Sequence, residues 1–157
     1  MSSATAYGSC LFSEDEFVSR VESCAYPNAE FKHADHIRLA WIYLRRYGPE
    51  GAEERIIATI QRFATSLGHT QKYHETMTRA WLRLVAAAYS ASPEAASFDD
   101  FIDKHGWLLE RDALSAFYSK ACLSSDLARH QWVEPDRRPL PCGSSTPLKP
   151  KATIRFG

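Results

Sequence analysis

The stretch FKHADHIRLAW, residues 31–41, decides the fold because it opens a helix that carries both an apolar face and two histidines. Ile37, Trp41 and Leu44 recur at helical spacing and form the apolar face. Gly48 is typical of a helix end, and Pro49 favours the first turn of a following helix. The sequence therefore predicts a helix over about 33–47 that packs by this face.

Apolar periodicity and capping signals on either side of this helix predict further helices. They are expected over about 13–25, 50–67, 71–90, 97–105 and 123–132, with short helical pieces within 107–118. No segment alternates with period two for long enough to predict a strand. The short connections favour antiparallel neighbours, so the predicted fold is all-α: a single-domain bundle of about four main helices plus short ones.

The predicted helix starts depend on N-cap residues. Ser13 begins a capping box with Glu16, and Ser97 begins a similar pattern. Thr70 is the expected cap of the helix over 71–90, and Ser124 or Ser125 that of the last helix, whose Leu127 is expected to face inward.

The chain divides into three parts by composition. Residues 1–11 are small and polar and are expected to be flexible, residues 12–133 form the helical domain, and residues 134–157 are Pro-rich. This tail is expected to be extended or disordered, because it lacks the apolar pattern of a regular element.

Charge and cysteine usage exclude several classes of protein. Among 157 residues, 19 basic side chains balance 19 acidic ones, which argues against a nucleic-acid partner. No apolar run reaches membrane-spanning length and no signal peptide is visible, so a cytoplasmic location is expected. The four cysteines are widely separated and lack a CxxC pair, which is typical of free thiols.

Three histidines form the main candidate site. His33 and His36 lie three residues apart on one side of a helix, and neutral imidazole is a common metal ligand. His74 lies near the start of the helix predicted over 71–90 and shares its apolar face with Met77 and Trp81, so it should point into the bundle. If the two helix starts meet, His33, His36 and His74 would hold a divalent metal, Fe or Zn. Alternatively, His33 caps its helix, His36 lies at the surface, and His74 is a core histidine bonded to a backbone carbonyl or a tyrosine.

Three other residues are candidate catalytic groups. Glu75 is a candidate fourth ligand or general base, although it could equally pair with Arg79 at i+4. Arg38 could clamp a carboxylate of the substrate, or form a surface ion pair. Tyr73 is a candidate hydrogen-bond donor at the pocket wall, and amphipathic packing explains it equally well.

The pattern FxHxxHxRxAWxYL over residues 31–44, followed by KYHET over 72–76, resembles a group of small helical bacterial proteins that are largely uncharacterised. The likeness spans about residues 12–138 and implies one domain with a shared site, but no reaction. The HxxH spacing is also similar to that of DinB-like metal-binding bundles, an analogy of fold type only.

These observations favour a small helical-bundle enzyme with a histidine-centred metal site that acts on a small molecule. One alternative is a metal-free enzyme in which His74 and Glu75 form an acid–base pair. Another is a non-catalytic binding or accessory protein whose Pro-rich tail docks a partner. The sequence leaves a homodimer open and does not identify the substrate.

Overall fold

The computed structural model describes residues 13–27, 31–69 and 72–141, and every regular element among them is helical. The elements are α1 (Glu14–Glu22), α2 (His33–Ser66), α3 (Glu75–Ala91), α4 (Phe98–Lys104), the 3₁₀ helices η4 (Gly106–Leu109) and η5 (Ala113–Ala116), α5 (Lys120–Leu123) and α6 (Asp126–His130). The all-α prediction is therefore confirmed. None of these helices is long and apolar enough to cross a lipid bilayer.

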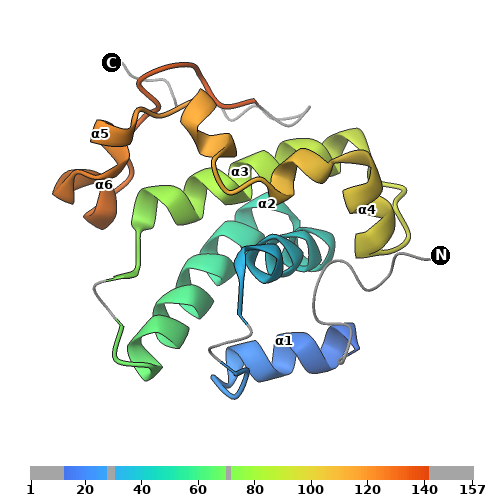
Figure 1. Cartoon of the computed structure of the whole chain (residues 1–157). Helices are drawn as coiled ribbons and strands as arrows, with labels where there is room; N and C mark the ends of the chain where they lie inside the picture. Colours follow the sequence, from blue (N-terminus) through green and yellow to red (C-terminus); the bar gives the residue numbers. More distant parts are fainter. Residues whose placement is uncertain (1–12, 28–30, 70–71, 142–157) are drawn as a thin grey trace.

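Helix α2 lies between α1 and α3 (Figure 1) and makes its most extensive contacts with α3. The short helices α5 and α6 lie near the start of α3, and α4 lies near its end. The core contains the residues predicted for the apolar face of 33–47, since Ile37, Trp41 and Leu44 are all buried. On the apolar face that the sequence also predicts for 50–67, Ile56, Ile60 and Phe63 are buried and Leu67 is partly buried.

Helix α2 is bent at Gly48, where the backbone adopts φ 77° and ψ 173°. Glycine tolerates this region because it has no Cβ, and Pro49 then starts the second half without needing a backbone N–H. The two helices predicted over 33–47 and 50–67 are thus the two halves of α2.

Helix α1 begins as predicted at Ser13, whose hydroxyl accepts a hydrogen bond of 3.1 Å from the Glu16 N–H. It ends at Glu22, three residues earlier than the predicted Ala25, and Cys24 follows with φ 65°. Buried Tyr43 of α2 donates a 2.5 Å hydrogen bond to Glu22, which fixes the end of α1 on the core.

The start of α3 differs from the prediction. The helix begins at Glu75 rather than near Gln71, and its N-cap is His74. Thr70, the predicted cap, lies outside the described residues. The Nδ1 atom of His74 accepts a 3.1 Å hydrogen bond from the Met77 N–H, the role that a Ser or Asp oxygen usually takes.

Helix α6 is shorter than predicted, and its inward residue is different. Ser125 caps it by accepting a 3.1 Å hydrogen bond from the Ala128 N–H. This start directs Ala128 into the core with 0% exposure, whereas Leu127 is 57% exposed, so the inward orientation expected for Leu127 is wrong.

The described part of the Pro-rich tail, residues 134–141, is irregular but attached to the helical domain. Asp136 accepts two 2.7 Å hydrogen bonds from Ser119, and Arg137 donates its backbone N–H to the Phe117 carbonyl at 2.8 Å. The remainder of the tail and the predicted flexible segment 1–11 lie outside the described residues.

Candidate functional site

His33 opens α2 and lies against α3. Its Nε2 is 2.9 Å from the Leu108 carbonyl, so this nitrogen carries the proton and Nδ1 has the free lone pair. The ring packs edge-on against Trp81 with centroids 4.5 Å apart. Burial lowers the pKa of His33, which keeps the imidazole neutral.

His36 lies one turn further along α2, with the opposite tautomer. Its Nδ1 is 3.3 Å from the Lys32 carbonyl, so Nδ1 carries the proton and Nε2 has the lone pair. The ring packs on Phe31 at 4.4 Å. The side chain keeps partial exposure but is closely surrounded, and this burial lowers the pKa of His36 to about 4.

His74 has a different environment from the other two histidines. Nδ1 accepts the Met77 N–H, and Nε2 donates a 2.8 Å hydrogen bond to the Leu123 carbonyl. Both ring nitrogens are therefore used, and the side chain is only 8% exposed. This is the core histidine bonded to a backbone carbonyl that the sequence left open as the alternative to a metal ligand.

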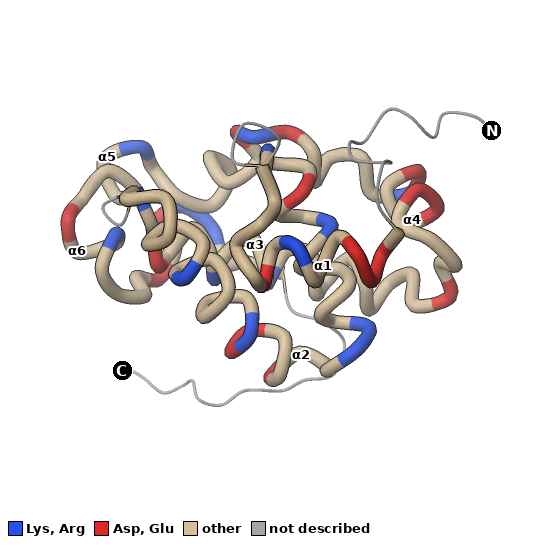
Figure 2. Tube along the Cα trace, turned by 90° about the horizontal axis from the view of Figure 1, so that it is seen from below, with Lys and Arg blue, Asp and Glu red and all other residues tan. Residues whose placement is uncertain are grey.

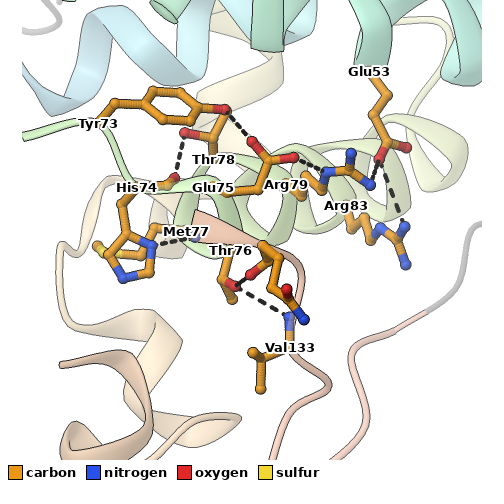
Figure 3. Close-up of polar contacts among 11 residues, drawn as sticks. Glu53, Tyr73, His74, Glu75, Thr76, Met77, Thr78, Arg79, Arg83 and Val133 are labelled. Carbon is orange, nitrogen blue, oxygen red and sulfur yellow. Dashed lines mark hydrogen bonds and ion pairs between the residues drawn. The ribbon is translucent and has the colours of Figure 1, made fainter. Parts of the chain in front are cut away.

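Tyr73 and Glu75, two of the predicted catalytic residues, are in direct contact (Figure 3). The Tyr73 hydroxyl donates to Glu75 Oε1 at 2.8 Å, and Arg79 donates from Nε to Glu75 Oε2 at 2.7 Å. The predicted i+4 pair is thus present. Arg79 also pairs with Glu53 of α2 at 3.3 Å, and Glu53 lies 3.7 Å from Arg83. Both carboxylate oxygens of Glu75 are thus engaged, and Glu53 links the network to α2.

Arg38, the third predicted catalytic residue, lies apart from this network. Its guanidinium is 4.6 Å from the centre of the Phe17 ring of α1. This cation–π contact attaches α1 to α2.

The structure thus brings together Tyr73 with Glu75, and His33 with His36, in two separate places. No group of three or more His, Cys, Asp or Glu side chains within the described ranges is arranged to hold a metal ion. The two histidines of α2 offer two lone pairs, and His74 offers none.

Two further features were missed in the sequence. Ser92, at the end of α3, lies 2.9 Å from His105 Nε2 and links α3 to α4. A cavity of about 360 Å³ is lined by residues of α3 and of the segment 132–140, including Arg83, Trp132, Arg137 and Arg138. The adjacent arginines of PDRRP were a signal for this second feature, but the proline content of the segment indicated only a tail.

Comparisons of the chain with protein-family models, curated proteins and solved structures find no match.

Proposed function

We propose that the protein is an enzyme acting on a small molecule, and that His33 and His36 at the start of α2 form its metal-binding centre. The support is the pairing of the two rings with backbone carbonyls. Each ring donates one N–H to a carbonyl, of Leu108 or Lys32, and keeps a lone pair on its other nitrogen. Ligating histidines in proteins usually donate their other ring N–H to a carbonyl or carboxylate, which fixes the tautomer.

The low pKa of His36 favours a ligand over a general base. An efficient base has a pKa near the working pH, whereas an imidazole with a pKa of about 4 is a weak base. The same imidazole binds a metal at neutral pH without first losing a proton. Water and substrate would fill the positions left by two protein ligands, and Fe or Zn would polarise a substrate oxygen or activate water.

Tyr73, Glu75 and Arg38 remain predictions as catalytic groups, because their contacts explain them as links between helices. The metal-free pair of His74 and Glu75 has less support, since His74 has no ring nitrogen left and both oxygens of Glu75 accept hydrogen bonds. Location in the cytoplasm and assembly as a homodimer also remain predictions.

Metal binding by the histidine pair can be tested with a matched control. His130 Nδ1 lies 2.9 Å from the Asp126 carbonyl four residues earlier, and His36 Nδ1 lies 3.3 Å from the Lys32 carbonyl at the same spacing. His36→Gln and His130→Gln therefore remove rings with the same kind of backbone contact. Purified protein would be analysed for bound metal and then titrated with Co²⁺, whose visible spectrum reports imidazole ligation.

We expect a saturable spectrum with about one Co²⁺ per chain, as for a single site. It should weaken at least about tenfold in His36→Gln and persist in His130→Gln. Equal spectra in the two variants, or none in the parent protein, would remove the metal centre from the proposal. Activity that survives chelation would instead favour a metal-free enzyme.

A further inference from the structure

The segment that follows α6 lines an open surface cavity of about 360 Å³ together with Arg83 of α3. Arg83, Arg137 and Arg138 are among the residues that line it, and Trp132 and Leu140 contribute apolar side chains. The volume is within the range of small-molecule pockets.

The two carboxylates on this cavity are engaged by neutral donors. Glu134 accepts a 2.9 Å hydrogen bond from Trp132 Nε1. Asp136 accepts hydrogen bonds from both the backbone and the hydroxyl of Ser119, which chiefly lower its pKa, with a smaller contribution from the charge of Arg137. Neither carboxylate forms an ion pair with the arginines of the cavity within the described residues.

Two of the three arginines, Arg83 and Arg138, lie over aromatic rings. Arg83 lies 4.4 Å from the Trp132 ring centre, and its nearest ion-pair contact is the long 3.7 Å approach to Glu53. Arg138 lies 5.1 Å from the Phe117 ring centre. A guanidinium stacked on a ring still has its N–H groups at the edge for an in-plane acceptor.

A second cavity, beside α1, provides a contrast. Its Arg46 is bound by Glu14 at 3.3 Å and by Asp15 at 2.6 Å. Figure 2 shows basic and acidic residues interspersed along the chain.

We propose that the cavity of Arg83, Trp132, Arg137 and Arg138 binds a small molecule that carries a phosphate monoester next to an apolar group. A phosphate has the double negative charge and the several acceptor oxygens that paired guanidinium forks recognise. Trp132, Pro139 and Leu140 provide the surface for the apolar part. This site is separate from the histidine pair and does not depend on it.

The test uses the full chain, with inorganic phosphate and phenyl phosphate as probes at constant ionic strength. Affinity is measured by calorimetry, and the indole N–H resonance of Trp132 reports the place of binding. Arg137→Gln with Arg138→Gln removes two guanidiniums while leaving their backbone contacts to Phe117 in place. Arg55→Gln is the control, because Arg55 is an exposed arginine stacked on Tyr47 at 4.0 Å, away from the cavity.

We expect both probes to shift the Trp132 resonance and phenyl phosphate to bind more tightly. The double variant should weaken both at least about tenfold, since it removes charge-assisted hydrogen bonds to the phosphate. Arg55→Gln should bind as the parent does.

If the double variant does not fold, Arg83→Gln should show the same loss. Equal binding in the double variant and the control, or binding that leaves the Trp132 resonance unchanged, would overturn the site. Equal affinity for the two probes would overturn the apolar part of the proposal.

Discussion

His74 donates a 2.8 Å hydrogen bond from Nε2 to the carbonyl of Leu123, which lies 49 residues away in the chain. The same ring caps α3 through Nδ1. One neutral imidazole therefore acts as donor and acceptor at once and joins the start of α3 to the end of α5.

Replacing His74 should separate these two contacts. His74→Ala loses the cap and the Leu123 bond, and we expect it to lower the free energy of unfolding by about 2–3 kcal/mol. His74→Asn keeps a capping side chain and should lose about 1 kcal/mol less. Urea denaturation measures both, and equal losses would show that the cap contributes little.

Acid should destabilise the protein because burial lowers the pKa of His33, His36, His74 and His105. An unfolded histidine titrates near pH 6.5, so below this pH the unfolded chain binds protons that the folded chain does not. The stability contributed by the neutral rings is complete above about pH 6.5 and is lost as pH falls toward the folded value, about 4 for His36.

The urea concentration at the midpoint of denaturation should therefore decrease as the pH is lowered from 7 to 4.5. His36→Gln should flatten this dependence, because burial lowers the pKa of His36 to about 4. His130→Gln, which removes an exposed ring, is the matched control. The same slope in His36→Gln as in the control would contradict the assignment.

Tyr43→Phe tests the junction of α1 and α2. The Tyr43 hydroxyl is fully buried, donates to Glu22 at 2.5 Å and lies 3.0 Å from the Thr59 hydroxyl. Its removal leaves Thr59 without this partner, so we expect a loss of about 1–3 kcal/mol in thermal or urea unfolding. Tyr89→Phe is the control, because its hydroxyl makes no hydrogen bond to the described residues, and it should change stability little.

Gly48→Ala tests the bend in α2. A Cβ at Gly48 meets no atom within 4 Å, so any cost comes from the backbone at φ 77° and ψ 173°. We expect a loss of about 1–3 kcal/mol. Gly106→Ala also has open space but no positive φ, and should be nearly neutral by the same unfolding measurement. A similar result for both glycines would mean that the bend carries no strain for alanine.

Local chemistry explains which helix starts were predictable. Ser13, Ser97 and Ser125 each accept a hydrogen bond from an N–H three residues on, so the signal and its partner lie in the same short stretch. His74 was placed inside a helix because imidazole is an unusual cap and its second partner, Leu123, is distant in the chain. The prediction of an inward Leu127 depended on its hydrophobicity alone and did not include the register of α6, which the Ser125 cap fixes.

The candidate site was predictable only within each segment. The spacing of His33 and His36 placed both on one turn, and the Glu75–Arg79 pair follows from i+4 spacing. Whether His74 would face the other two histidines depends on how two helix starts meet, which no local pattern determines. The cluster of Arg83 with Arg137 and Arg138 likewise arises from the path of an irregular segment.

The bend at Gly48 has a consequence for the size of the molecule. A straight helix of 34 residues would measure about 50 Å, whereas a compact chain of this length has a radius of gyration of about 15 Å. An unbent rod would extend beyond the body of the protein, and Ile56, Ile60 and Phe63 would then face water. Gly48, which has no side chain, thus allows α2 to bend so that the apolar residues of its second half are buried.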